Sequence, residues 1–189
     1  AGVKVVANSN TLADKLGEGR FAAEDFPREI AAIASAFEVV RIDGPDYRAA
    51  QRAETAALTA EQVEQAAASV RAGGAAGAAG GVVTRDRFPE LLAHLRRVHP
   101  VQVSAMVEGV DLVVLSDVAP IDNQGDALLF VHLVDELYDA EIPVAATGCA
   151  VGDLFPVSYR AGGYRKKYGR CESRLSALLA EAAALSRSR

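Results

Sequence analysis

Residues 112–117 read Leu-Val-Val-Leu-Ser-Asp, an unbroken apolar run that ends in a hydroxyl and a carboxylate. Such a run is typical of a strand that is buried on both faces of a parallel sheet. A stretch with a broad apolar helical face follows from about Asp126 to Asp139, and a second apolar run occupies Ile142–Ala146. The order strand, helix, strand predicts a parallel crossover in this part of the chain. A final helix is expected from about Glu172 onward.

The same order is predicted near the N-terminus. Val3–Ala7 is a continuous β-type run, and Phe37–Ile42 is a second one that ends in turn residues. Between them, apolar residues at helical spacing predict a helix that begins at Asp25 or Pro27. The chain has no initiator Met and starts almost directly on a core strand, so we expect it to be part of a longer polypeptide.

The middle of the chain has a different pattern. Ala49–Ala57 and Thr59–Arg71 are Ala-rich helical segments, and Thr59 with Gln62 has the spacing of a capping box. The stretch 73–81 holds five glycines in nine residues and predicts a flexible loop. No Lys follows it as a phosphate-binding P-loop requires. An amphipathic helix is then expected from Phe88 up to His99 and Pro100, which completes an α/β protein with a helical middle segment.

Composition limits the classes of function. The chain has 189 residues, of which 50% are hydrophobic and 24% charged, which is ordinary for a globular domain. Its net charge of −5 argues against a general nucleic-acid binder. Residues 160–189 nevertheless carry eight Lys or Arg and two Glu. A basic end on an acidic body indicates a surface for an anion or an acidic partner, although a solvated charged helix end explains it equally. Two cysteines make no disulfide framework and favour a reducing compartment.

Candidate functional residues lie at strand ends and in the basic end. Asn10 follows the first predicted strand, where ligands bind in open parallel sheets, although such an amide more often caps a turn. Asp117 ends a strand in the manner of a Mg²⁺-holding carboxylate, but Val118 follows it, so strand-end chemistry is favoured. Arg170 and Arg174 are four apart on one helix face, which suits bidentate binding of a phosphate, and equally suits pairing with the acidic body of the chain. No Ser-His-Asp, Cys-His or metal-ligand set is visible in the sequence.

Several motifs together resemble a known family. They are Val-Val-Ala-Asn-Ser-Asn at 5–10, the stretch 39–48 that ends in Asp-Tyr-Arg, Leu-Val-Asp-Glu-Leu-Tyr-Asp at 133–139, and Arg-Cys-Glu-Ser-Arg-Leu at 170–175. Their content and order resemble the ZapE-like AAA+ ATPases of cell division, whose mitochondrial relatives act in protein quality control. The resemblance spans nearly the whole chain. The stretches 17–20 and 162–168, with sixteen Arg against four Lys, point to the actinobacterial branch.

The resemblance implies specific roles for four residues. Asn10 resembles the sensor residue that touches the γ-phosphate or its attacking water. Arg20 resembles an arginine finger, and Arg170 and Arg174 resemble arginines that sense nucleotide from the C-terminal side. The family's Walker A and Walker B motifs lie upstream of the point where this chain begins. The resemblance thus implies ATP and Mg²⁺ for the full-length protein and none on this chain.

The resemblance also implies an organisation. The sheet is expected to be a partial P-loop NTPase-type parallel sheet with strand-helix-strand units at both ends. Residues 1–48 would end the AAA+ nucleotide-binding core, 49–110 would be a helical linker with the Gly/Ala loop, and 111–189 a C-terminal α/β unit with a basic last helix.

Two functions follow from this reading, and a third has little support. The first is the C-terminal part of an ATP-driven, homo-oligomeric, cytoplasmic protein that acts on protein partners such as cell-division proteins, with no nucleic acid and at most peripheral membrane contact. The second is a non-catalytic α/β interaction module whose basic end docks an acidic partner or a membrane surface. The third is a small-molecule enzyme that uses the turn at 8–10.

Overall fold

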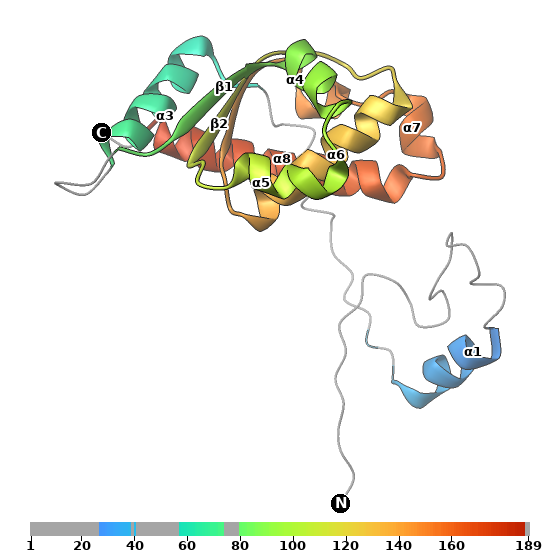
Figure 1. Cartoon of the computed structure of the whole chain (residues 1–189). Helices are drawn as coiled ribbons and strands as arrows, with labels where there is room; N and C mark the ends of the chain where they lie inside the picture. Colours follow the sequence, from blue (N-terminus) through green and yellow to red (C-terminus); the bar gives the residue numbers. More distant parts are fainter. Residues whose placement is uncertain (1–26, 39, 41–56, 74–79, 188–189) are drawn as a thin grey trace, which may run out of the picture. The chain divides into compact units, whose positions relative to one another are not determined.

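A computed structural model describes residues 27–38, 40, 57–73 and 80–187. The chain divides into two compact units, Ala1–Pro45 and Asp46–Arg189. In the first unit, the described residues form helix α1 (Pro27–Ala36), which confirms the helix predicted to begin at Asp25 or Pro27 (Figure 1). The predicted strand Val3–Ala7 and the predicted helix 49–56 lie outside the described residues.

The predicted strand Phe37–Ile42 is not formed in those residues of the stretch that the structure describes. Phe37, Glu38 and Val40 are described, and all three lie in irregular structure. Within the described part of this unit there is no other strand that could supply backbone hydrogen bonds to them, and a lone strand leaves those groups unpaired.

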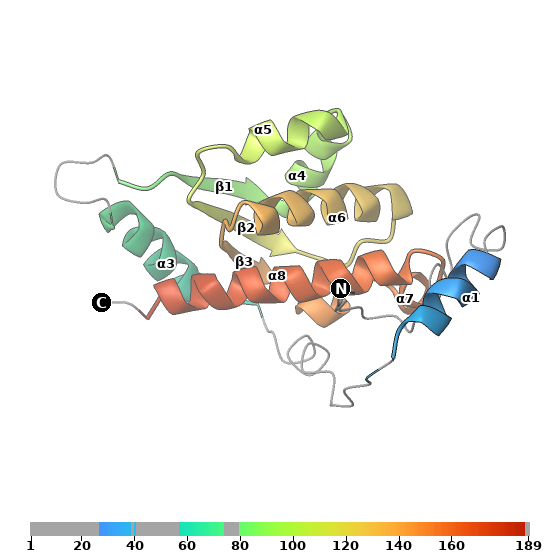
Figure 2. The same ribbon diagram turned by 90° about the horizontal axis from the view of Figure 1, so that it is seen from below.

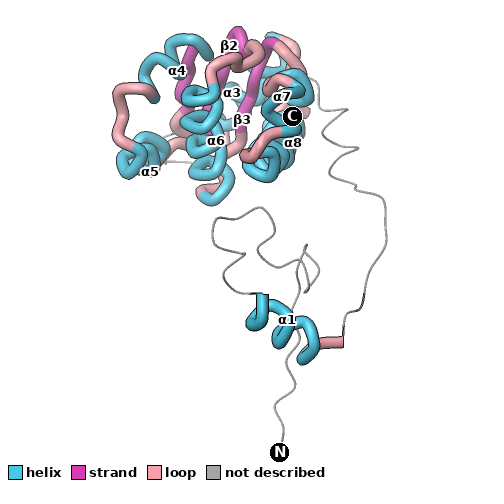
Figure 3. Tube along the Cα trace, turned by 90° about the vertical axis from the view of Figure 1, so that its right-hand side faces the viewer, coloured by secondary structure: helices cyan, strands magenta, loops and turns pink. Residues whose placement is uncertain are grey.

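The second unit is built on a parallel sheet. Its three described strands are β1 (Val83–Arg87), β2 (Leu112–Val118) and β3 (Val144–Gly148), in the order β1-β2-β3 (Figures 1 and 3). Both pairings are parallel. The central strand β2 carries four consecutive buried residues, which confirms the strand expected at 112–117. The mixed α/β class with a parallel sheet is therefore as predicted.

Helices cover both faces of the sheet (Figure 2). Val113 and Leu115 of β2 join the larger core, whereas Leu112 and Val114 point into the smaller one. This alternation follows from the two-residue period of a strand. The helices of this unit are α3 (Ala60–Ala72), α4 (Phe88–Leu95), α5 (Val103–Val107), α6 (Gln124–Asp139), α7 (Val157–Ala161) and α8 (Arg165–Leu185), with 3-10 turns η3 (Pro100–Gln102) and η4 (Val151–Asp153).

Strand β1 is not among the predicted elements. Its sequence, Val-Thr-Arg-Asp-Arg, lacks an apolar run because it lies at an end of the described sheet, beside β2 only. Ion pairs hold its polar side chains instead. The Arg85 guanidinium donates hydrogen bonds to both carboxylate oxygens of Glu64 on α3, at 2.7 and 2.8 Å. The segment predicted to be a helical linker thus also contributes a strand. The three-part division of the chain itself stays a prediction.

The helix predicted from Phe88 up to His99 and Pro100 is shorter in the structure and ends at Leu95, since His99, the residue before Pro100, is extended. The capping box of Thr59 and Gln62 is formed at the start of α3. The last helix, however, begins at Arg165 rather than near Glu172, so its predicted start is wrong. The cause is packing: Tyr168 is fully buried against the rings of Phe155 and Tyr159, which draws the basic stretch into the helix.

The start of α6 is fixed by a buried carboxylate. Asn123 accepts a hydrogen bond from the Asp126 backbone N–H at 3.1 Å and caps the helix. The Asp126 side chain, only 7% exposed, accepts a bond from Arg96 Nε at 2.6 Å. This bond lowers the pKa of Asp126 below its ordinary value of 3.8, against the opposing effect of burial. The pair joins the end of α4 to the start of α6.

We expect the replacement Asp126→Asn to lower the free energy of unfolding by about 1–2 kcal/mol, because a charge-assisted bond to a 58% exposed Arg96 is partly screened by water. Since the folded pKa is depressed, the stabilisation is complete above the ordinary value of 3.8 and is lost as the pH falls through the folded value. Urea unfolding at pH 7 and at pH 2.5–4 measures this. The variant should lose less stability than the parent on acidification, whereas Asp122→Asn, an exposed carboxylate before α6, should behave like the parent. An equal acid loss in Asp126→Asn and the parent would contradict the assignment.

Candidate functional site

The carboxyl ends of the strands meet at Arg87, Asp117 and Gly148. Asp117 has φ +59° where the pairing of β2 with β3 is irregular. Its carboxylate accepts bonds from Arg87 Nε and Nη2, both at 3.1 Å. Ligands bind at this edge of open α/β sheets. In this structure, however, a cation from the neighbouring strand neutralises Asp117, in agreement with the favoured strand-end interpretation.

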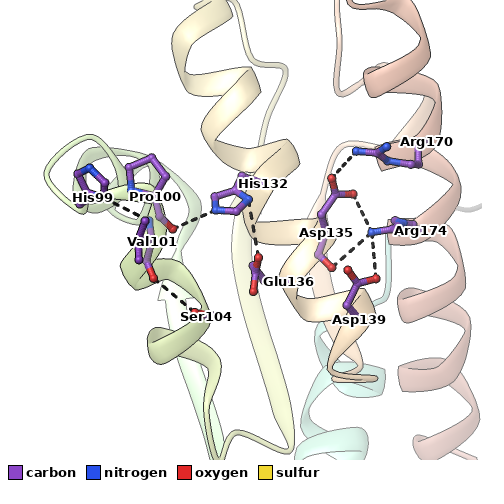
Figure 4. A network of polar contacts seen from close by, with 10 residues as sticks. All are labelled: His99, Pro100, Val101, Ser104, His132, Asp135, Glu136, Asp139, Arg170 and Arg174. Atoms are coloured by element: carbon purple, nitrogen blue, oxygen red, sulfur yellow. Dashed lines mark hydrogen bonds and ion pairs between the residues drawn. The ribbon is translucent and has the colours of Figure 1, made fainter.

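Arg170 and Arg174 lie together on α8 and face helix α6 (Figure 4). Arg170 Nη2 lies 2.6 Å from Asp135 Oδ2. Arg174 Nη1 lies 3.0 Å from Asp135 Oδ1 and 3.2 Å from Asp139 Oδ1. The two cations and two carboxylates form a charge-balanced cluster, which we call the α6–α8 clamp.

The two arginines of the clamp differ in their surroundings. Arg174 is 23% exposed, and its guanidinium also lies over the Tyr138 ring, 4.7 Å from the centroid. Arg170 is 51% exposed and contacts a single carboxylate. Between them Cys171 is fully buried, and burial holds the pKa of its thiol well above the ordinary value. Arg174 is therefore a packed structural cation, and Arg170 is the member that remains open to solvent.

Only some of the predicted site residues lie within the described part of the chain. Asn10 and Arg20 lie outside the described residues. The structure brings Arg170 and Arg174 together on one helix face, as their spacing indicates, and pairs both with carboxylates of the chain itself, the predicted alternative to a phosphate. Their role toward nucleotide stays a prediction. Asp135 and Asp139, which form these ion pairs, are not among the sequence predictions. Their spacing of four residues in the 133–139 motif is the signal that could have identified them.

The ion pair between Arg160 and Glu172 is not among the sequence predictions. Glu172 of α8 is buried, and its Oε1 lies 3.5 Å from Arg160 Nε of α7. The same guanidinium donates to the carbonyl oxygens of Phe155 and Gly152. Arg160 thus fixes the turn η4 that follows β3. Nothing in the local sequence indicates this pairing, because it joins three separate segments.

Among the described residues, no group of three or more His, Cys, Asp or Glu is arranged to hold a metal ion. Of the two arginines, Arg170 has the more exposed side chain, at 51% against 23% for Arg174. No helix in the described segments is long and apolar enough to cross a lipid bilayer.

The parallel sheet with helices on both faces is consistent with part of a P-loop NTPase-like fold. A family model described as AFG1-like ATPase matches residues 1–187. The chain therefore belongs to the AFG1-like ATPase family. No curated protein and no solved structure matches it.

Family membership confirms the broader part of the predicted identity. The AFG1-like family includes the ZapE proteins, and it indicates an AAA+ ATPase-related function with use of nucleotide and Mg²⁺. The narrower assignment to the ZapE-like proteins of actinobacteria stays a prediction.

Proposed function

We propose that this chain is part of an ATP-hydrolysing AAA+ protein that acts on protein partners in cell division or protein quality control. Asn10 contacts the γ-phosphate or its attacking water, and Arg20 acts as an arginine finger. Arg170, and with it Arg174, senses nucleotide from the C-terminal side. The full-length protein holds ATP and Mg²⁺ and assembles as a cytoplasmic homo-oligomer, with no nucleic acid and at most peripheral membrane contact.

The match to the AFG1-like ATPase family over residues 1–187 is the observation that supports this proposal. The motif Gly-x-x-x-x-Gly-Lys-Ser/Thr does not occur in the 189 residues, and phosphate binding in this class depends on it. We therefore propose that the Walker A and Walker B motifs are supplied by sequence upstream of Ala1. On that basis residues 1–189 alone hydrolyse no ATP.

The test is the replacement Arg20→Ala in a polypeptide that carries the Walker motifs together with residues 1–189. An arginine finger stabilises charge that develops in the transition state, so kcat should fall by about 10³-fold or more. The dissociation constant for ATP should change by less than about twofold. Steady-state turnover and nucleotide titration measure the two quantities separately.

Arg28→Ala is the matched control, because Arg28 is an exposed arginine in the same unit and should leave both quantities unchanged. Equal losses in kcat and in the affinity for ATP in Arg20→Ala would contradict the role of Arg20 as an arginine finger. ATP turnover by purified residues 1–189 would contradict the dependence on upstream motifs.

A non-catalytic interaction module is the second candidate. It is favoured by the α6–α8 clamp, in which both candidate nucleotide arginines already contact carboxylates. The absence of ATP turnover in the longer polypeptide would leave this candidate in place of the ATPase.

A further inference from the structure

Two surfaces of opposite charge occupy different parts of the second unit. The first is a hollow of about 580 Å³ between α5 and the end of α6, which we call the acidic groove. Three carboxylates line it, and none of its lining residues is Lys or Arg. Apolar residues also line it. The lining includes Ala105, Glu108, Glu136, Asp139 and Ile142.

Glu108 is the most available carboxylate of the groove. Glu136 lies 3.9 Å from His132, and Asp139 belongs to the α6–α8 clamp. Glu108 is exposed, and it forms no ion pair with any described residue. Next to it, Gly109 leaves the rim open, since a Cβ at this position would meet no atom within 4 Å. A long cationic side chain can therefore reach Glu108 without displacing protein atoms.

The second surface is a basic corner at the start of α8, formed by Tyr164, Arg165, Lys166 and Lys167. All four residues are exposed, Tyr164 by 43%. The cations occupy the first turn of α8, which contains no acidic residue and no side-chain cap. Positive charge is unfavourable at the N-terminus of a helix. The α8 dipole therefore does not favour Arg165 or Lys167, and a carboxylate brought from outside would offset their charge. Lys167 Nζ lies 5.4 Å from the centroid of the Tyr164 ring.

The two surfaces match in chemistry and lie apart on the unit. Each combines charge with apolar area, because Ile142 and Ala105 line the groove while Tyr164 lies next to the cations. The groove lies where β2 and β3 begin, and the corner follows η4 beyond the carboxyl end of β3. Figure 2 shows α7 and the first turn of α8 at one end of this unit, and the end of α6 away from them, toward α3. One copy cannot join its own two surfaces.

We infer that the basic corner of one copy docks in the acidic groove of a second copy. Because two different surfaces meet, the contact is head-to-tail and can build a ring or an open chain, unlike a two-fold dimer. The inference rests on the homo-oligomer of the proposed function and names the surface that joins its subunits. Arg165 and Lys167 supply the cations, and Glu108 supplies the most available carboxylate.

The experiment is a charge swap, followed by sedimentation velocity of the 189-residue chain over a range of concentrations at 50 and 300 mM NaCl. The parent should self-associate, more weakly at the higher salt concentration. Glu108→Arg and Lys167→Glu should each weaken association by about tenfold or more, because each places like charges together. An equimolar mixture of the two variants should associate like the parent, since every contact in an alternating chain then pairs opposite charges.

Matched controls change charge elsewhere on the unit. Glu181→Arg and Arg97→Glu replace exposed residues outside both surfaces and should associate like the parent. A chain that is monomeric at all concentrations, variants that associate like the parent, or a mixture no stronger than its components would each overturn the inference. None of these results depends on ATP turnover, so failure here is separate from failure of the proposed ATPase.

Discussion

Replacement of Gly148 by alanine should lower the free energy of unfolding by about 3 kcal/mol or more, because two costs add at this position. Gly148 has φ +123°, a conformation that an L-residue rarely adopts. A Cβ here would also lie 2.1 Å from the carbonyl oxygen of Val118 and 2.5 Å from its nitrogen. These are backbone atoms of β2, so the neighbouring strand itself must move.

The close approach serves a hydrogen bond at the carboxyl edge of the sheet. The Cys149 backbone N–H donates to the Val118 carbonyl oxygen at 2.8 Å, just past the irregular pairing of β2 and β3. An added methyl group would separate the strands at this point. We therefore expect Gly148→Ala to disturb the edge that carries Asp117 and η4 as well as to destabilise the unit.

Two other glycines divide the effect into its parts. Gly109 has φ +74° but open space around a Cβ, so Gly109→Ala measures the backbone cost alone, about 1 kcal/mol. Gly163 has neither a positive φ nor a close neighbour, so Gly163→Ala should be nearly neutral. Urea unfolding followed by circular dichroism ranks the three variants. A loss for Gly148→Ala no larger than that for Gly109→Ala would show that β2 adjusts at no cost.

The elements that the sequence predicts well carry a regular apolar pattern. Strand β2, helix α6 and the capping box of α3 are local features, and the structure contains all three. Strand β1 has no such pattern, because ion pairs to Glu64 and Asp117 hold its arginines. The start of α8 depends on the burial of Tyr168 in an aromatic cluster, which no short stretch of sequence reveals.

The candidate site shows the same division. The spacing of Arg170 and Arg174 places them on one helix face, and this much follows from helix geometry. Which group they meet depends on the packing of α8 on α6, which sets Asp135 between them. Helix geometry could therefore predict a pair of cooperating arginines, but it left their partner open between a phosphate and a carboxylate.

We expect Arg170 and Arg174 to contribute differently to stability, with Arg174→Ala lowering the free energy of unfolding more than Arg170→Ala. This replacement removes the contacts with Asp135 and Asp139 and the packing on Tyr138, from a side chain that is only 23% exposed. We expect a loss of about 2–3 kcal/mol in the free energy of unfolding, measured by urea titration. Arg170→Ala removes one ion pair at a half-exposed position and should cost less than about 1 kcal/mol.

Salt and a double-mutant cycle test this assignment. The loss for Arg174→Ala should persist at 0.5 M NaCl, since a packed pair is screened less than an exposed one. Combined with Asp135→Ala, it should show a coupling energy of about 1–2 kcal/mol. A coupling near zero would mean that the clamp contributes nothing to folding.

The same pair of variants bears on nucleotide sensing. In the polypeptide that carries the Walker motifs, Arg170→Ala should weaken ATP binding, because Arg170 is the more exposed of the two arginines. The free energy of unfolding should hardly change. Arg174→Ala should act on ATP through the fold, so Arg174→Lys, which keeps the charge but not the fork of contacts, should not restore the lost stability. If neither Arg170→Ala nor Arg174→Ala alters ATP binding, the clamp is a structural device of the C-terminal unit and the nucleotide is sensed elsewhere in the chain.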